Sequence, residues 1–551
     1  MDRDRSVSKR LTVPWWSAVL LAAIPVMFLG YFFIYPLAAI VIRGLGTAEN
    51  VLDPFTNVFT DAGLRRVAWF TLWQAVVSTS LTLAVGIPCA YVLSRFSFPG
   101  RRFISAATLV PFVLPTLVVG TAFLALLGPG SPIGIDLRGT VWAILIAHVF
   151  YNLAIVIRGV GSFWEQLDPR MEEAAEVLGA TRWGAFRAVT LPLLAPAIAA
   201  SAALVFLFSF TSFGVILVLG NLRHTTLEVE IWRQTTVFLD FEAATALAVL
   251  QLLGVGLILV LYGVFQRRRR QELSLVPGSP ARRRPRSRAE RALIATTMGT
   301  LGIIVGLPIA VLVTRSLRTP DGVGIGNYTS LADASATPAL FAPPLEAVAN
   351  SISIAVAAVL VATLVGMLAA ATISYSESRS GRVFDLTIML PLGASAVTIG
   401  FGFLIALDRP IDLRASIVLL PIAHALVAIP FLVRAVVPVM GAVRHRLREA
   451  AQVLGASPFR AWRSVDLPLV ARALLVGAAF AFAISIGEFG ATAFIVRPAS
   501  PTIPFAIYRL LSQPGTGNFG KAMALSVVLM AITIAAVFAI EALRRDRAEE
   551  I

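Results

Sequence analysis

The sequence predicts an all-α polytopic membrane protein made of two tandem, parallel repeats of one six-helix domain, with about 12 transmembrane helices in all. Of its 551 residues, 57% are hydrophobic and only 14% are charged, and the mean hydropathy is +0.82. Such values are not typical of a soluble protein of this length. The apolar runs are roughly 20 residues or longer, which is enough to cross a ~30 Å hydrocarbon core as a helix. Because lipid cannot satisfy free backbone groups, a helical bundle is expected.

An internal repeat supports the tandem arrangement. Residues 172–194 (EEAAEVLGATRWGAFRAVTLPLL) recur as residues 448–470 (REAAQVLGASPFRAWRSVDLPLV), 276 positions further along the chain. The same offset pairs His148 with His424, and an offset of 280 applies further upstream. The two halves are therefore homologous, with four extra residues in the first half.

Each half contains six apolar segments of membrane-spanning length. The predicted helices cover residues 15–42, 67–94, 102–128, 140–160, 194–218 and 240–265, then 292–316, 345–375, 383–407, 412–435, 470–494 and 520–542. We therefore expect one domain over residues 1–265 and a second over residues 292–551.

The intervening residues 266–291 are rich in arginine, proline, glycine and serine. This composition predicts a disordered linker, and the positive-inside rule places the linker in the cytoplasm. With an even number of helices in each half, both chain termini are also expected in the cytoplasm. The net charge of +15 comes largely from arginines that flank apolar runs, so it indicates membrane topology and not nucleic acid binding.

A polar loop of about 30 residues between the fourth and fifth predicted helices of each half is long enough to need a structure of its own. Its alanines favour a short helix, its glycine suits the left-handed residue that ends a helix, and its proline suits the first turn of the next helix. We expect a short helix held beneath the membrane, with a carboxylate and small side chains suited to a groove on a partner. The repeated positions are Glu173, Ala174, Ala175, Gly179, Leu191 and Pro192 in the first half and Glu449, Ala450, Ala451, Gly455, Leu467 and Pro468 in the second.

The spacing of these residues resembles the EAA loop of binding-protein-dependent ABC importer permeases, and both halves match it. The resemblance implies the fold of a type I ABC importer permease domain in each half. It also implies that the loops dock on two copies of a separate ABC ATPase, which holds ATP and Mg, and that an extracytoplasmic binding protein delivers a small solute. The chain itself would bind no cofactor and catalyse no reaction. Its location would be the plasma membrane of a prokaryote.

Fused double permeases of this length resemble the thiamine and ferric-iron importer group. Residues 225–228 (TTLE) resemble the thiamine-type permeases, whereas residues 487–495 (GEFGATAFI) are similar to sulfate and molybdate permeases. A thiamine-type solute is favoured, with ferric iron and sulfate, molybdate or another small ion as alternatives. A gradient-driven secondary transporter would also have twelve helices and repeats, but it would not need two matched docking loops.

One acidic residue in a predicted membrane helix is the main candidate for the solute pathway. Glu488 occupies an otherwise apolar segment, and its first-half equivalent is Ser212, so the halves would present different groups to the solute. The acid would favour a cation. Alternatively, Glu488 lies at the outer mouth, because it is about 30 Å from Pro468 at ~1.5 Å per residue. The pathway candidates are Ser212, Phe213, Gly214, Glu488, Phe489 and Gly490.

Two further patterns do not predict sites. Residues 515–521 (GTGNFGK) resemble a phosphate-binding loop, but Ala522 has no hydroxyl to hold Mg²⁺, so a turn leading into the last helix is expected. The four histidines are too scattered to predict a metal site. We expect His148 and His424 to pack or to form interhelical hydrogen bonds.

Overall fold

The structure, a computed structural model, describes residues 15–45, 53–268, 282–333, 342–375, 379–409, 411–442, 445–497 and 499–545. Within these ranges, the strands are a single hairpin, β1 (Arg318–Thr319) and β2 (Gly322–Val323). Among the described residues, ten helices are long and apolar enough to cross a membrane, or up to 12 if each of two bent helix pairs is counted as one span. The chain is therefore an all-α polytopic membrane protein.

The helices of the first half follow the predicted order. They are α1 (Trp15–Leu29), α2 (Tyr35–Leu45), α3 (Asp53–Thr60), α4 (Ala62–Arg95), α5 (Arg101–Ala107), α6 (Val110–Val113), α7 (Thr116–Leu127), α8 (Val141–Gln166), α9 (Arg170–Val177), α10 (Arg182–Ala185), α11 (Leu191–Phe210), α12 (Gly214–Leu219), α13 (Leu227–Arg233) and α14 (Phe241–Arg268).

The second half repeats this order. Its helices are α15 (Arg288–Leu301), α16 (Leu307–Ser316), α17 (Gly326–Thr329), α18 (Pro344–Tyr375), α19 (Arg379–Gly393), α20 (Ala396–Ala406), α21 (Leu419–Ala442), α22 (His445–Val453), α23 (Pro458–Ala461), α24 (Leu467–Gly487), α25 (Thr492–Ile495), α26 (Ile503–Ser512) and α27 (Thr516–Arg545). The predicted turn at residues 515–521 is wrong for most of this segment, since α27 already begins at Thr516 and only Gly515 precedes it.

Prolines set the position of four π-helical turns. The turns Gly30–Ile34, Phe186–Thr190, Gly302–Gly306 and Trp462–Asp466 each end two residues before a proline, at Pro36, Pro192, Pro308 and Pro468. A proline has no N–H to donate to the carbonyl one turn earlier, and a wider π-helical turn accommodates that loss. As predicted, Pro192 and Pro468 lie in the first turns of α11 and α24.

The third predicted helix of each half is broken, which corrects the continuous helices expected over 102–128 and 383–407. The segments Arg101–Val113 and Thr116–Leu127 meet at 103°, and the segments Gly381–Gly393 and Ala396–Ala406 meet at 96°. In the first half, Leu114 precedes Pro115 and has an extended backbone (ψ 136°), which ends the helix at Val113. In the second half, the bend lies at Ser395, which has an extended backbone. Its side chain caps α20 by accepting a hydrogen bond from the Thr398 N–H at 3.0 Å.

The fifth predicted helices end earlier than expected, and the fourth helix of the second half is displaced. The expected segments 194–218 and 470–494 end as regular helices at Phe210 and Gly487, and the segment 412–435 is observed as Leu419–Ala442. Both early ends fall just before the predicted pathway residues, so those residues lie in non-helical breaks or at their edges.

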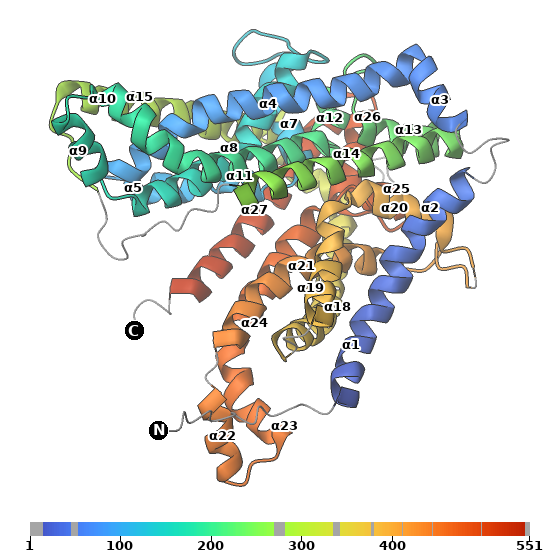
Figure 1. The fold of residues 1–551 in the computed structure, drawn as a ribbon. Helices are drawn as coiled ribbons and strands as arrows, with labels where there is room; N and C mark the ends of the chain where they lie inside the picture. Colours follow the sequence, from blue (N-terminus) through green and yellow to red (C-terminus); the bar gives the residue numbers. More distant parts are fainter. Residues whose placement is uncertain are drawn as a thin grey trace. The chain divides into compact units, whose positions relative to one another are not determined.

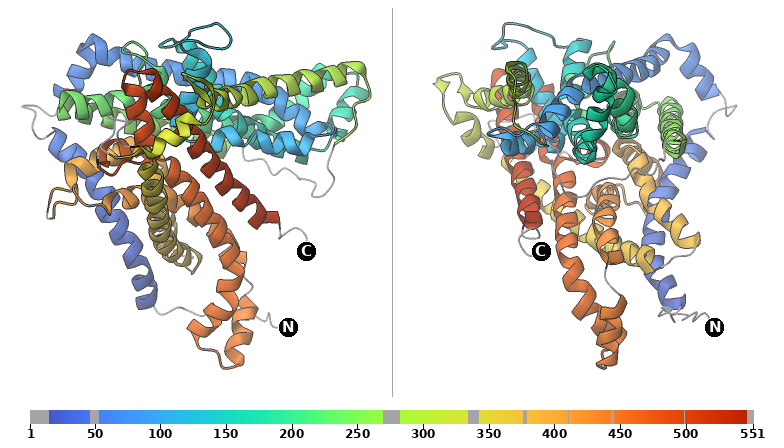
Figure 2. Two further views of the ribbon diagram at one scale, coloured as in Figure 1. Left: turned by 180° about the vertical axis from the view of Figure 1, so that it is seen from behind. Right: turned by 60° about the vertical axis from the view of Figure 1, so that its left-hand side comes forward.

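The described residues form two compact units. The larger unit contains residues 41–350 and 492–534. In it, α4, α8 and α11 pack together and bury a core that includes Val156, Trp164 and Val205 (Figures 1 and 2). A close approach of α4 and α8 requires glycine at position 86, because a Cβ there would lie 2.7 Å from Val156 Cβ. The first helix of the second half joins this unit, with Leu301 packing near Cys89.

The smaller unit contains residues 1–40, 351–491 and 535–551. Its helices α21 and α24 pack closely, and Gly366 repeats the contact made by Gly86, with a Cβ position 2.7 Å from Leu432. The first helix of the chain belongs to this unit, where the Tyr35 hydroxyl donates to the Ala406 carbonyl at 3.2 Å. Each half thus gives its first helix to the other compact unit, so these units do not follow the predicted domain boundaries, which stay a prediction.

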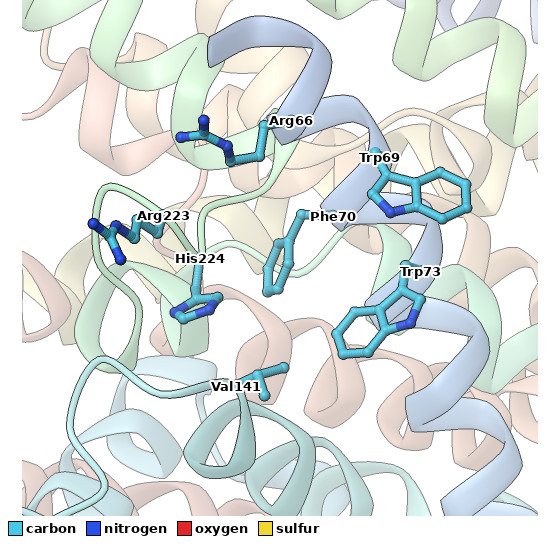
Figure 3. Close-up of a pocket in the computed structure, with 7 residues that line it drawn as sticks. All are labelled: Arg66, Trp69, Phe70, Trp73, Val141, Arg223 and His224. Carbon is cyan, nitrogen blue, oxygen red and sulfur yellow. The ribbon is translucent and has the colours of Figure 1, made fainter. Parts of the chain in front are cut away.

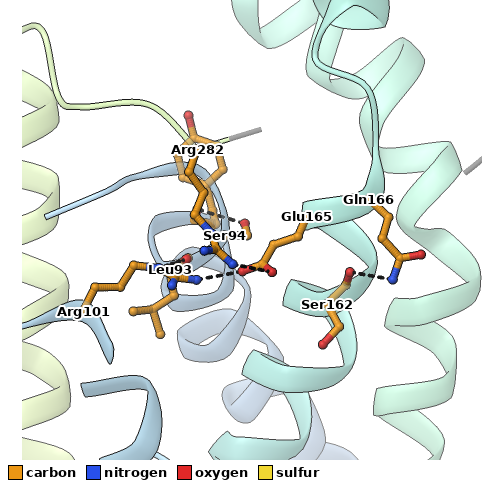
Figure 4. A network of polar contacts seen from close by, with 8 residues as sticks. Leu93, Ser94, Arg101, Ser162, Glu165, Gln166 and Arg282 are labelled. Atoms are coloured by element: carbon orange, nitrogen blue, oxygen red, sulfur yellow. Dashed lines mark hydrogen bonds and ion pairs between the residues drawn. The ribbon is translucent and has the colours of Figure 1, made fainter. Parts of the chain in front are cut away.

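Part of the predicted linker is ordered, which corrects the expectation of disorder over 266–291. α14 extends to Arg268 and α15 begins at Arg288, whereas residues 269–281 lie outside the described residues. Glu165, near the end of α8, accepts from Arg101 and from Arg282, each at 2.8 Å (Figure 4). We call Arg101, Glu165 and Arg282 the linker clamp. The second half has Gly381 and Gly441 at the positions of Arg101 and Glu165, so the linker clamp is specific to the first half.

Next to the linker clamp, Arg283 holds the linker end to the chain after α4. Its N–H donates to the Arg95 carbonyl at 3.0 Å, and its carbonyl accepts from the Ser97 N–H at 3.0 Å. Its guanidinium lies 5.0 Å from the centre of the Phe96 ring and forms an ion pair with Glu290 at 2.6 Å. Backbone hydrogen bonds on both sides of one residue fix its path, so the start of α15 is tied to the end of α4.

Replacing Glu165 by alanine is expected to loosen the linker without unfolding the bundle. The change removes two partly exposed ion pairs, worth about 1 kcal/mol together, and the population of the released linker should rise roughly fivefold. Limited trypsin digestion with peptide mapping should show faster cleavage at Arg282 to Arg286. Asp136→Ala, which removes the exposed pair with Arg138, is the matched control. An unchanged cleavage rate in Glu165→Ala would show that the clamp does not hold the linker.

Candidate functional site

The loop after α8 forms a short helix that ends on a left-handed glycine. The Leu178 N–H donates to the Ala174 carbonyl at 3.1 Å, and the Ala180 N–H donates to the Ala175 carbonyl at 3.0 Å. Gly179 between them has φ +92°. This is the Schellman termination, in which glycine avoids the Cβ penalty of the left-handed conformation. The Gly179 N–H also donates to the Glu176 carbonyl at 3.0 Å, so the carbonyls of Ala175 and Glu176 close the end of α9.

The second half builds the same termination. The Leu454 N–H donates to the Ala450 carbonyl at 3.1 Å, and the Ala456 N–H donates to the Ala451 carbonyl at 3.0 Å. Gly455 has φ +82°. The predicted left-handed conformation of both loop glycines is thus confirmed, and the two loops share one backbone geometry. We call residues 170–190 and 445–466 the two coupling loops, after the role that the resemblance in the sequence predicts for them.

Each coupling loop exposes two aliphatic side chains next to its glycine. Val177 and Leu178 are 86% and 88% exposed, and Val453 and Leu454 are both 87% exposed. Both loops therefore present an exposed aliphatic pair at the end of their short helix. The sequence motif did not single them out, although their repetition 276 residues apart was a sign that they matter.

The first coupling loop is braced by a carboxylate that the sequence did not single out. Glu172 accepts a hydrogen bond from the Thr190 hydroxyl and lies 3.8 Å from the Arg95 guanidinium. Arg95 is 7% exposed and closes α4. The predicted Glu173, by contrast, is exposed. Glu172 therefore ties α9 to the next helix and to α4, whereas Glu173 faces away from the fold.

The remaining predicted loop residues lie at the start of the next membrane helix. Leu191 is 37% exposed and begins α11, and Leu467 begins α24 in the same way. Of Glu449, the structure describes only the backbone, within α22. The coupling loops thus pass through π-helical turns directly into α11 and α24.

The predicted pathway residues lie at the breaks that follow α11 and α24. Ser212 and Phe213 are 6% exposed, Glu488 is 8% exposed and Phe489 is 3% exposed. Glu488 Oε1 accepts from the Ala491 N–H at 2.9 Å and spans the break. Whether Glu488 lies in the pathway or at the outer mouth stays a prediction.

The two equivalent histidines contact the two equivalent pathway residues. His148 Nε2 lies 2.9 Å from the Ser212 hydroxyl, and His148 Nδ1 lies 3.0 Å from the Ser78 hydroxyl. In the second half, His424 Nε2 lies 3.1 Å from Glu488 Oε2. The predicted interhelical hydrogen bonds of the histidines are thus observed. Each pair joins the fourth membrane helix of its half to the break after the fifth.

The same breaks abut the bends in the third helices. A Cβ at Gly214 would lie 2.5 Å from the Thr116 hydroxyl, and a Cβ at Gly490 would lie 2.9 Å from Ala396 Cβ. Thr116 and Ala396 are the first residues of α7 and α20, immediately after the two bends. Each half therefore brings a bent third helix, a broken fifth helix and a histidine of the fourth helix to one place.

Comparisons with known proteins identify the family. The model of the family described as "Binding-protein-dependent transport system inner membrane component" matches residues 82–271 and 362–547. The thiamine transport system permease protein of Brucella abortus is 29% identical over 492 residues, which cover 86% of this chain and 87% of that protein. Its counterpart in Escherichia coli is 28% identical over 485 residues, covering 84% of this chain and 86% of that protein.

A shorter relative matches half of the chain. The sulfate transport system permease protein of Escherichia coli is 33% identical over 273 residues, which cover 48% of this chain and 96% of that protein. The family model matches once in each half and covers more than half of the chain in total. This multi-pass membrane protein therefore belongs to the family of inner-membrane components of binding-protein-dependent transport systems, and it is a permease subunit of an ABC importer.

Proposed function

We propose that the chain forms both halves of the path for a thiamine-type cation, received from an extracytoplasmic binding protein. The observation that carries the proposal is the similarity to the two thiamine transport permeases, which extends over at least 84% of this chain. The buried Glu488 adds chemical support, because an intramembrane carboxylate stabilises a cation. Sulfate is the second candidate, favoured by the 33% identity to the sulfate permease.

The energy for transport comes from a separate ATPase. The two coupling loops have one backbone geometry, and each exposes an aliphatic pair. Two equivalent loops suit two copies of one ATPase subunit, which hold the ATP and Mg. The positions proposed to transmit the movement are those predicted from the sequence motif, Glu173 to Ala175 with Gly179, Leu191 and Pro192, and Glu449 to Ala451 with Gly455, Leu467 and Pro468, together with the exposed aliphatic pairs.

The solute passes the breaks at Ser212–Phe213–Gly214 and Glu488–Phe489–Gly490. Non-helical backbone at membrane depth is tolerated where it is buried in protein or lines a cavity, so these breaks suit a pathway. The coupling loops and the arginine-rich linker lie on the cytoplasmic side, together with both chain termini. The loops after the second and eighth predicted helices also carry arginine, as the positive-inside rule requires.

Uptake measurements in the native host test the solute. A strain lacking this chain should lose uptake of labelled thiamine and keep uptake of labelled sulfate, and the reintroduced wild-type chain should restore thiamine uptake. If the strain loses uptake of sulfate and keeps uptake of thiamine, the solute is sulfate and not thiamine. Retention of both uptakes would contradict both solute assignments.

A further inference from the structure

A cavity of about 550 Å³ opens at the end of α4 that lies opposite the coupling loop. Its lining combines two arginines with four aromatic rings, from Arg66, Trp69, Phe70, Trp73, Arg223 and His224. In Figure 3, the two guanidinium groups gather on one side of the cavity and the two indoles on the other. None of the lining residues that the structure describes is acidic.

The basic side of the cavity is built on a fixed loop. His224 Nδ1 lies 2.7 Å from the Gly139 carbonyl, and the His224 ring centre lies 5.5 Å from that of Phe70. The Asn221 side-chain oxygen accepts from the Arg223 N–H at 2.8 Å, and its amide donates to the Gly139 carbonyl at 2.7 Å. The backbone that carries Arg223 is thereby positioned before any ligand binds.

The aromatic side of the cavity continues into an apolar stripe on α4. Trp69, Leu72, Trp73 and Val76 are 65%, 44%, 38% and 48% exposed. Their spacing places them on one face of the helix, and tryptophans are typical of the membrane–water interface. In a membrane helix, an exposed apolar stripe faces acyl chains. The cavity therefore lies where lipid tails meet water.

Arg66 also borders a neighbouring cavity of about 780 Å³ whose lining includes four acidic residues. Three of these accept hydrogen bonds from other groups. Asp61 accepts from the Leu64 N–H at 2.8 Å, Glu230 accepts from Arg233 at 2.9 Å, and Asp240 accepts from the Ala243 N–H at 2.9 Å. Of these two cavities, Arg223 lines the one with the tryptophans. Its positive charge therefore adds to that of Arg66 at the aromatic cavity.

The second half does not repeat this set of side chains. At the offsets of the internal repeat, Glu346, Ala349 and Ser353 take the places of Arg66, Trp69 and Trp73, and Ala499 takes that of Arg223. The basic and aromatic lining is thus not a requirement of the repeated fold. It distinguishes one half of the permease from the other.

We propose that this cavity binds one phospholipid with an anionic headgroup. Arg66 and Arg223 bind the phosphate, the two indoles lie at the level of the glycerol ester groups, and the acyl chains follow the stripe through Leu72 and Val76. Arginines bind phosphate with charge-assisted hydrogen bonds, and basic pockets between membrane helices recognise anionic headgroups. The lipid would hold the ends of α4 and α8 together on one half only.

Native mass spectrometry of the purified protein with added lipid tests the proposal. Phosphatidylglycerol should remain bound to the wild-type protein at concentrations roughly tenfold lower than phosphatidylcholine. The double variant R66Q/R223Q should lose that preference. R138Q/R414Q is the matched control, since these two exposed arginines are equivalent in the two halves and pair with Asp136 and Asp412. The control should keep the preference.

Two further measurements distinguish a bound lipid from a bound soluble phosphate and from misfolding. Water-soluble glycerol 3-phosphate should not displace the lipid; if it binds as tightly as phosphatidylglycerol, the cavity takes a soluble phosphate and the lipid assignment is wrong. Equal retention of the two lipids by the wild-type protein, or an unchanged preference in R66Q/R223Q, would also overturn the proposal. R66K/R223K, which keeps both charges, should keep the preference and shows that loss in R66Q/R223Q is not misfolding.

Discussion

Replacing Gly179 and Gly455 together by valine is expected to abolish ATP-driven uptake and to weaken ATPase association. Both glycines have positive φ, at +92° and +82°, and an added Cβ at either would meet nothing within 4 Å. The penalty is therefore conformational and not steric within the chain. A non-glycine residue in the left-handed conformation costs ~1–2 kcal/mol, which corresponds to roughly tenfold less correctly formed loop at each site. Uptake by membranes and co-purification of the ATPase would measure the effect.

Two controls isolate the backbone as the cause. Asparagine tolerates the left-handed conformation, so G179N/G455N should keep much of the activity that the valine variant loses. Gly441 lies in α21 without positive φ and with open space around its Cβ position, so G441A should be close to wild type. Equal loss in the asparagine and valine variants would indicate that any side chain at these sites blocks docking, and full activity of the valine variant would contradict the proposed coupling role.

Replacing Glu488 by alanine is expected to destabilise the second half by ~3 kcal/mol. The carboxylate is buried, contacts His424 Nε2 at 3.1 Å and accepts from the Ala491 N–H at 2.9 Å. Removal of the carboxylate leaves the buried His424 ring and the Ala491 N–H without this hydrogen-bond partner, and Ala491 is 0% exposed. Thermal unfolding in detergent would show a lower melting temperature.

The first half supplies the matched comparison. Ser212 is equivalent to Glu488 and contacts the equivalent histidine at 2.9 Å through a neutral hydroxyl. S212A should therefore cost only about 1 kcal/mol. The variant E488Q keeps the shape and removes the charge, so the proposed pathway role predicts lower uptake of a cation with a smaller loss of stability. An E488A variant as stable as S212A would show that the buried pair does not hold the break.

Sequence periodicity predicted the elements that depend on local composition or on repetition. Hydropathy located the membrane helices, and the self-comparison located both coupling loops and the left-handed Gly179 and Gly455. It did not locate the bends before Thr116 and Ala396, because the segments on both sides of each bend are apolar. The early end of α11 at Phe210 was missed for the same reason.

The sequence pattern could not predict contacts between residues that are far apart in the chain. Glu488 was recognised as an unusual intramembrane acid and His424 as a repeated histidine, but 64 positions separate them and only the fold brings them to 3.1 Å. The sequence did not predict the linker clamp, because the composition of the linker is typical of disorder. The end of the linker is ordered by contacts with Glu165 and with the chain after α4. The exchange of first helices between compact units also has no local signature.

Cross-linking from the two coupling loops tests the account most directly. V177C and V453C place a thiol on each exposed aliphatic pair, and the background can be made cysteine-free by C89A, since Cys89 is the only cysteine. L222C, with a native side chain that is 75% exposed in the loop after α12, is the control at the opposite end of the helices. In native membranes, each coupling-loop variant should give an adduct with the ATPase, the V177C/V453C variant should carry two ATPase copies, and L222C should give none. If V177C or V453C gives no adduct with the ATPase, the account is contradicted.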